Sequence, residues 1–201
     1  MSPRRADPAL RARRRAELIK AGYAEILEKG IHGTTLNSVV ARAGSSKGGA
    51  LHYFPTKDDL LFAVLEWVLS QVDRTLDDVV RHQGNARRRL ASELEVLFHS
   101  ADVNRKLYLV LFDFVSLSAR SDRFRSLLES FFESCRQRDV GIVEDGIEHG
   151  DFRRVSPEDA AVTIRALVDG YCLQWLMGPE TAPVEVYRDR CRAVLASYLL
   201  R

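Results

Sequence analysis

The stretch TTLNSVVARAGSSKGGALHYFPTKDDLL, residues 34–61, decides the fold because it encodes two short helices and the turn between them. Thr35 can cap the first of these helices, which we expect over residues 36–43 with its apolar side chains facing inward. Gly44 then supplies the left-handed backbone that ends it.

The second short helix follows at once. Ser46 is a capping residue for a helix from Lys47 to about His52, and this helix must end near Pro55 because proline disfavours helical backbone in the residue before it. Two short helices joined by a tight, glycine-containing turn are typical of a helix-turn-helix. The second helix of such a unit projects from the surface and fits the major groove of DNA, which is about 12 Å wide.

Charge is divided unevenly along the chain. Residues 1–57 hold eleven Lys or Arg against four Asp or Glu, a net charge of +7, whereas the remainder carries a net charge of −5. A basic head on an acidic body suggests a polyanion as the partner of the head alone. A solvated basic surface is the alternative that charge by itself leaves open.

Apolar residues recur at steps of three and four almost throughout, and sustained period-two alternation is missing, so we expect an all-α protein of about nine helices. Asp7 and Pro8 begin a long first helix that Gly30 and Gly33 end. Thr56 opens a fourth helix. The expected ranges for the fourth and later helices are 56–84, 86–101, 103–119, 122–149, 157–177 and 183–200. We therefore predict an N-terminal helix-turn-helix domain over residues 1–56 and a larger helical domain over residues 57–201.

Composition narrows the class of protein further. The chain has 201 residues, 46% of them apolar, with no signal-peptide run and no stretch long enough to span a membrane, so we expect a cytoplasmic protein without a membrane partner. Cys135, Cys172 and Cys191 are odd in number and widely spaced, which favours small buried thiols over disulfides or a zinc site. Metal-binding, phosphate-loop and dinucleotide motifs are missing from the sequence, so we expect neither a cofactor nor an enzyme.

One string does match an enzyme motif. Residues 44–48, GSSKG, fit the G-x-S-x-G pattern in which Ser46 would be a nucleophile. That motif requires a strand before the serine, whereas residues 39–43 are expected to be helical. We therefore interpret Ser46 as a helix cap.

The strings ARAGSSKG, residues 41–48, and HYFPTKDDLL, residues 52–61, resemble the motif of the tetracycline-repressor (TetR) family of transcriptional regulators. The resemblance covers residues 34–61 and implies that Ser46 and Lys47 begin the recognition helix. It also implies that His52 and Tyr53 contact phosphates and that Phe54 fills the core. Two departures stand out: Ser45 replaces the usual valine of the turn, and glycines at the start of the recognition helix leave it with few long side chains.

Basic side chains, short hydroxyls and small residues of the head make up the candidate DNA contacts. The small ones permit close backbone approach, or, for the alanine, contact with a thymine methyl. The full set is Thr35, Arg42, Ser45, Ser46, Lys47, Gly48, Ala50, His52, Tyr53 and Lys57.

The body has two features of its own. Aromatic residues concentrate where the family places its ligand cavity, and the candidate ligand contacts are Phe98, Tyr108, Phe112, Asp113 and Phe131, with a plain aromatic core as the alternative. The last two helices carry more apolar surface than one solvent-facing layer can hide, which suggests pairing with a second copy, as the resemblance implies, or packing within the chain. The candidate interface residues are Ile164, Leu167, Tyr171, Trp175, Tyr187, Cys191, Val194 and Tyr198.

The resulting hypothesis is a homodimeric regulator that binds double-stranded DNA and responds to a small molecule of unknown identity. We expect repression, with release from a palindromic operator on ligand binding. The alternative is a ligand-independent DNA-organising or protein-interaction module that uses the same helix-turn-helix.

Overall fold

The computed structural model of the chain describes residues 7–81, 84–179 and 181–200. Over these ranges the protein forms nine α-helices and no strand, which confirms the all-α prediction. Arg4 and Arg5, which are two of the eleven basic residues of the N-terminal part, and the expected continuation of the fourth helix over residues 82–83 lie outside the described residues. The helices are α1 (Pro8–Gly33), α2 (Leu36–Arg42), α3 (Lys47–Tyr53), α4 (Lys57–Arg81), α5 (Ala86–Leu97), α6 (Ala101–Ser118), α7 (Asp122–Glu148), α8 (Pro157–Met177) and α9 (Val184–Leu199).

The chain divides into two compact units, Met1–Leu69 and Ser70–Arg201, and the boundary falls within α4. Helix α4 opens at Thr56, as expected, with an acidic capping box. The Asp59 backbone N–H donates to Thr56 Oγ1 at 3.1 Å, and the Thr56 backbone N–H donates to Asp59 Oδ2 at 3.2 Å. This pair satisfies two of the N–H groups that a helix start leaves open.

Caps fix both ends of the long first helix. Asp7 Oδ1 accepts a hydrogen bond from the Ala9 backbone N–H at 3.0 Å, and Pro8 occupies the first helical position. Near the other end, Gly30 takes a left-handed φ of 67°, which bends the chain before its last turn.

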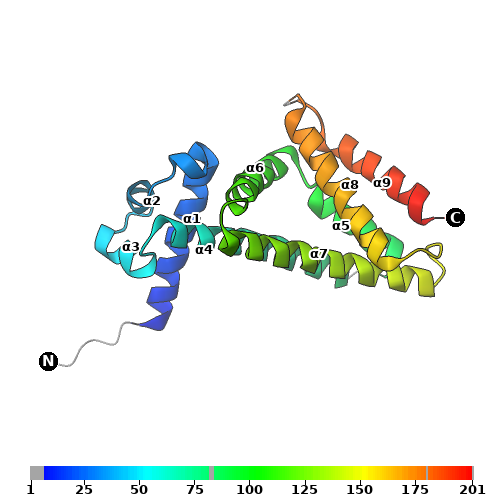
Figure 1. Cartoon of the computed structure of the whole chain (residues 1–201), viewed down its shortest axis with the longest axis horizontal. Coiled ribbons are helices and arrows are strands. Elements are labelled where there is room, and N and C mark those ends of the chain that lie inside the picture. The colour runs from blue at the N-terminus through cyan, green and yellow to red at the C-terminus, as the bar shows by residue number, and fades with distance from the viewer. Residues whose placement is uncertain (1–6, 82–83, 180, 201) are drawn as a thin grey trace. The chain divides into compact units, whose positions relative to one another are not determined.

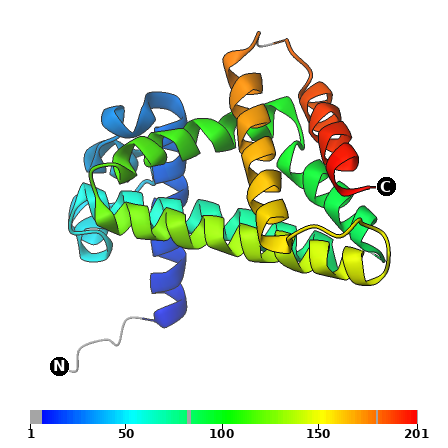
Figure 2. The same ribbon diagram turned by 45° about the vertical axis from the view of Figure 1, so that its right-hand side comes forward.

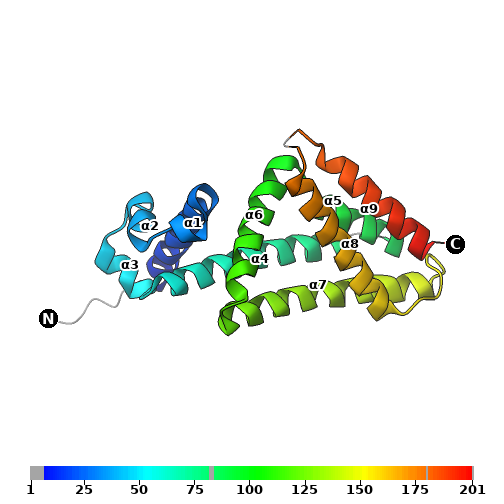
Figure 3. The ribbon, with the colours of Figure 1, turned by 45° about the horizontal axis from the view of Figure 1, so that its top comes forward.

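The two short helices begin and end where their sequence predicts. The Ser38 backbone N–H donates to Thr35 Oγ1, and the Gly49 backbone N–H donates to Ser46 Oγ, each at 3.1 Å. Gly44, with φ +58°, ends the first of them. Figure 3 shows α1, α2 and α3 gathered in the first unit.

In the core of the first unit, α1 approaches α4 closely at Gly22. A Cβ placed on Gly22 would lie 3.0 Å from Val64 Cγ2, so only glycine fits here without displacing its neighbour. Leu18, Val39 and Phe54 are each at most 2% exposed and join this core. Phe54 is therefore the core residue that the sequence predicted.

In the second unit, α7 packs against α5, α6 and α8, and α8 also packs against α9 (Figure 1). Figure 2 shows the start of α8 lying on α7. The connection between these two helices is tight: Gly150 has φ +76°, and the Phe152 ring occupies the space that a side chain on Gly146 would need. The stop predicted at Gly150 is thus observed.

Helix α5 is shorter than its sequence predicted, ending at Leu97 rather than near residue 101, and α6 starts two residues early at Ala101. Asn104 explains the break. This fully buried side chain donates from Nδ2 to the Leu97 carbonyl at 2.6 Å, while its Oδ1 accepts from the Ser100 backbone N–H at 3.3 Å. A single amide therefore joins the two helix ends.

Candidate DNA-binding surface and sensor core

Helix α3 presents a narrow exposed face. Lys47, Gly48, Leu51 and His52 are exposed, and Tyr53 is half-buried. Leu51 was not among the predicted contacts, although it lies four residues after Lys47 and therefore on the same face of the helix. Four exposed residues on one short helix form a surface of the size that enters a major groove.

Ala50 departs from its predicted role. It is 2% exposed and belongs to the core of the first unit, because its place on α3 faces inward with Phe54. A methyl group buried in this way cannot meet a thymine methyl unless the head rearranges. The glycines at positions 48 and 49 therefore account for the small size of the exposed face.

The start of α1 contributes basic residues beside α3. Arg11 Nη2 lies 3.1 Å from His52 Nε2, and the Arg15 guanidinium lies 5.4 Å from the centre of the Phe54 ring. The sequence indicated only that this arginine cluster was basic. Its contact with His52 could not be read from two positions that are 41 residues apart.

Arg42 is engaged inside the first unit. Its Nε donates to Glu25 Oε1 at 2.6 Å and its Nη2 donates to Glu28. Hydrogen bonds from Lys29, Arg42 and Ser38 lower the pKa of the nearly fully buried Glu25 to about 2. The positive charge of Arg42 is thus balanced by two carboxylates of α1.

The remaining candidate contacts keep donors available. Lys57 Nζ donates to the Ile31 carbonyl at 2.7 Å, which leaves two of its three N–H groups. Thr35 and Ser46 use their side-chain oxygens as acceptors in helix caps, so each hydroxyl hydrogen is still free to be donated elsewhere. Thr35 and Ser46 are exposed, whereas Ser45 is half-buried.

The predicted ligand contacts divide into two groups by burial. Phe98 and Tyr108 are at most 3% exposed, whereas Phe112, Asp113 and Phe131 are half-buried. The rings of Tyr108 and Phe112 lie 6.0 Å apart, within the range of aromatic contact. The structure therefore brings two of these five side chains together on α6.

A buried polar cluster lies beside this aromatic region and was not foreseen from the sequence. Glu93 on α5 and Asp139 on α7 are fully buried, and Arg165 on α8 is 7% exposed. Arg165 Nη1 lies 3.8 Å from Glu93 Oε1, and its Nη2 donates to Asp169 Oδ1 at 3.2 Å. None of the four Glu93 and Asp139 carboxyl oxygens accepts a hydrogen bond from an N–H or hydroxyl donor of the described chain.

Burial controls the ionisation of this cluster. Loss of solvation raises the pKa of Asp139 well above its ordinary value, and the neighbouring Glu93 carboxylate raises it further. Loss of solvation likewise raises the pKa of Glu93. Two adjoining carboxyls with raised pKa values hold a proton between them more readily than either would alone.

Beside the cluster, α7 is tied to the part of α4 that belongs to the second unit. Arg138 Nη2 donates to Asp73 Oδ1 at 2.6 Å and to Asp77 Oδ1 at 2.9 Å, and its side chain is 7% exposed. The three cysteines are buried free thiols, as their spacing predicted. Burial raises the pKa of Cys172 and of Cys191 to about 12, so both stay protonated near neutral pH.

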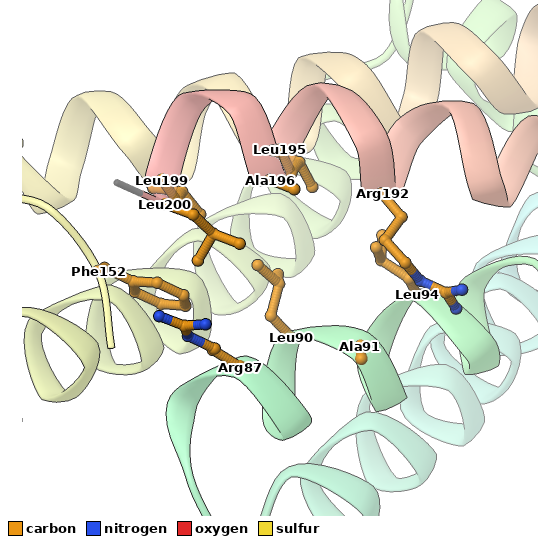
Figure 4. A pocket seen from close by; sticks show the side chains of 10 residues that line it. All are labelled: Arg87, Leu90, Ala91, Leu94, Phe152, Arg192, Leu195, Ala196, Leu199 and Leu200. Atoms are coloured by element: carbon orange, nitrogen blue, oxygen red, sulfur yellow. The ribbon is translucent and has the colours of Figure 1, made fainter. Parts of the chain in front are cut away.

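A cavity of about 220 Å³ lies between α5 and α9. Its walls are almost entirely apolar and include Leu90, Leu94, Phe152, Leu195 and Leu199 (Figure 4). The ligand contacts predicted from the sequence do not line it. The sequence did not predict this cavity, because its lining residues have the pattern expected of two amphipathic helices that pack directly against each other.

The outer faces of α8 and α9 carry uncovered apolar side chains. Val162 is 57% exposed, Leu173 43% and Met177 78% on α8, and Val186 is 42% exposed on α9. Three of the predicted partner residues, Ile164, Trp175 and Cys191, are instead buried within the chain. Val194 is 38% exposed, while the other four, Leu167, Tyr171, Tyr187 and Tyr198, are half-buried.

Neither a helix long and apolar enough to cross a membrane nor a group of acidic, histidine and cysteine side chains suited to a metal ion occurs among the described residues. The described chain therefore offers a basic helix-turn-helix and a helical body with a polar core. This combination defines the class of helix-turn-helix transcriptional regulators.

Sequence comparison places the chain within one family of that class. Residues 18–64 match the tetR family of bacterial regulatory proteins, and residues 86–200 match the C-terminal domain of BetI-type transcriptional repressors. The second match alone spans more than half of the chain. The protein belongs to the TetR family, with a BetI-type C-terminal domain.

Individual relatives agree with this assignment. The chain is 29% identical to the HTH-type transcriptional regulator YfiR of Bacillus subtilis over 72% of this chain and 71% of that protein. It is 25% identical to the HTH-type transcriptional regulator BetI of Brucella canis over 83% of this chain and 82% of that protein. A transcriptional regulator from Saccharomonospora viridis, solved in complex with choline, has the same fold, with a TM-score of 0.88, 19% identity, and coverage of 94% of this chain and 99% of that one.

Proposed function

We propose that this regulator binds a palindromic operator as a homodimer and releases it when a small molecule enters the helical body. In this proposal each protomer places one α3 helix in the major groove, and the two grooves are about 34–36 Å apart. The observation that carries it is the exposed face formed by Lys47, Gly48, Leu51 and His52, within residues 1–57, whose net charge is +7. We further propose residues 1–56 as the DNA-binding domain and residues 57–201 as the ligand-binding and dimerisation domain.

The DNA contacts we propose fall into two roles. Lys47, at the start of α3, and the hydroxyls of Thr35, Ser45 and Ser46 would position the phosphate backbone. His52 and Tyr53, at the other end of the helix, would add further phosphate contacts, and Arg11 would act through its contact with His52. Because α3 exposes few long side chains, base recognition would rest on close approach of the backbone at Gly48 and on Leu51.

Dimerisation is proposed through α8 and α9. Val162, Leu173 and Met177 follow one face of α8 at steps of eleven and four residues, and Val186 and Val194 lie on α9. An uncovered apolar face of this kind gains stability when it is buried against its own copy. The half-buried Leu167, Tyr171, Tyr187 and Tyr198 would support the edges of that interface.

The effector site is proposed around the aromatic and polar residues in the middle of the second unit. Tyr108 and Phe112 would supply ring faces, and the Glu93–Asp139 pair, with one proton held between its carboxyls, would supply one negative charge. The choline complex of the structural neighbour favours a small cation as the first effector to try. A ligand can release DNA only if it binds the two dimer conformations with different affinity.

A salt titration of DNA binding tests the proposal. The slope of log Kd against log salt measures how many phosphates the protein neutralises. We expect Lys47→Ala to weaken binding and to reduce that slope by about one unit, because a phosphate contact is lost. Arg120→Ala removes the same charge from an exposed position of the second unit and should leave the slope unchanged. Equal effects of the two substitutions would contradict the proposed surface.

A further inference from the structure

The cavity between α5 and α9 has a defined origin in the sequence. Ala91 on α5 and Ala196 on α9 both line it, and each stands next to a leucine of the same wall, Leu90 or Leu195. Small side chains at these two positions leave room that leucines would fill. The remaining volume of about 220 Å³ equals that of roughly seven water molecules, which suits an aliphatic chain of roughly eight carbon atoms.

The charged residues that line this cavity are all of one sign. Arg87 and Arg192 line it and no carboxylate does, among the described residues. Figure 4 shows the Arg87 guanidinium beside Phe152 and the Arg192 guanidinium beside Leu94, both over the apolar wall. Arginine in such a place favours a ligand with a planar anionic group such as a carboxylate.

Not every N–H group of Arg192 has a hydrogen-bond acceptor. Its Nη1 lies 3.2 Å from Asp189 Oδ1 and its Nη2 lies 3.8 Å from Glu95 Oε1, whereas its Nε is buried and has no hydrogen-bond acceptor in the described chain. The Arg87 Nε, in contrast, already donates to the Asp151 carbonyl at 3.1 Å. Because the Arg192 Nε is closed off, an acceptor brought in by a ligand would bind the Nη N–H groups that Asp189 and Glu95 leave open.

We propose that this cavity binds an aliphatic carboxylate of roughly six to ten carbon atoms, with its chain along the leucines and its carboxylate on Arg192. The site is separate from the cationic effector region proposed above, since its lining residues and its charge are different. It also needs no DNA, so its test does not depend on the proposed function.

Calorimetric titration of the DNA-free protein with octanoate, 1-octanol and octylammonium, all below their micellar concentrations, tests the inference. We expect octanoate to bind about tenfold more tightly than either of the other two, because only octanoate offers Arg192 an anionic, bidentate acceptor. Equal affinity for octanoate and octylammonium would overturn the proposal.

Substitutions then locate the binding. Ala196→Leu fills the cavity, and Arg192→Gln removes the charged donor; we expect each to weaken octanoate binding about tenfold or more. Arg88→Gln is the matched control, since Arg88 is exposed on the same helix as Arg87 and does not line the cavity. If Ala196→Leu alters the melting temperature, Ala91→Leu fills the cavity from the opposite wall. Wild-type octanoate affinity in a folded cavity-filling variant would place the ligand elsewhere.

Discussion

Arg42 Nε donates to Glu25 Oε1 at 2.6 Å, so the end of α2 is joined to the buried side of α1 by a charged hydrogen bond. The carboxylate is 2% exposed and also accepts from Lys29 Nζ at 2.8 Å. Arg42 therefore stabilises the first unit in addition to adding positive charge to it.

This contact predicts a loss of stability when the arginine is removed. Arg42→Met should lower the free energy of unfolding by more than Arg13→Met does, because a buried carboxylate loses a charged donor while Lys29 keeps part of the site satisfied. Urea denaturation measures the change. Arg13→Met is the control, since the Arg13 side chain is 67% exposed and its pair with Glu17 should contribute little. Unchanged stability in Arg42→Met, together with a smaller salt slope for DNA binding, would show that Arg42 is a DNA contact instead.

The buried pair of Glu93 and Asp139 leads us to expect that Asp139→Asn is more stable than wild type at high pH. Because burial raises the pKa of Asp139, the folded protein favours the protonated acid, and that contribution is complete below the ordinary aspartate pKa and lost as pH rises through the raised value. Asp139→Asn does not titrate, so it should melt about 2–4 °C above wild type at pH 8, the shift that corresponds to about 1 kcal/mol. The difference should shrink toward pH 5.

Thermal unfolding across this pH range measures the effect. Asp122→Asn is the matched control, since the Asp122 side chain is 92% exposed, and it should follow wild type at every pH. An Asp139→Asn protein that melts lower than wild type at pH 8 would mean that the carboxylate is charged and satisfied in the native core.

Leu173 predicts the oligomeric state. It is 43% exposed in the middle of the apolar face of α8, so Leu173→Glu should place a charge inside the proposed dimer interface and yield monomers. Light scattering after size exclusion measures this directly. Val103→Glu changes a valine that is 47% exposed on α6 and should leave the dimer intact. Dimers of Leu173→Glu as stable as those of wild type would move the interface away from α8.

We expect the Lys57 side chain both to hold the end of α1 and to contact DNA. Its Nζ already donates to the Ile31 carbonyl, and we expect a remaining N–H to reach a phosphate. Lys57→Ala should then reduce the salt slope of DNA binding by about one unit. An unchanged slope would restrict Lys57 to holding the end of α1.

Local sequence predicted the ends of α2 and α3 and the start of α4 to within one residue because their causes are local. Thr35, Ser46 and Thr56 cap within three residues of themselves, and Gly44 needs only its own backbone freedom. The resemblance to the TetR family rested on this same region. Residues 34–61 were therefore enough to predict both the helix-turn-helix and the family.

Features that depend on distant neighbours could not be predicted. Ala50 lies on a helix whose period allows two faces, and only the packing around Phe54 decides which face is buried. The helical spacing likewise placed Trp175 on an apolar face, but it could not show whether that face packs inside the chain or against a second copy. Glu93, Asp139 and Arg165 stand on three different helices, so their meeting has no local signal.

We propose that two copies of α3 contact one DNA duplex together. Selection of duplexes from a random pool by the wild-type protein, followed by footprinting of the enriched sequences, tests it most directly. We predict a two-fold symmetric sequence whose half-site centres lie about 10 base pairs apart, or a multiple of that spacing, protected by a dimer. A pool that shows no enrichment even at low salt, or enrichment of a sequence without two-fold symmetry, would contradict the account.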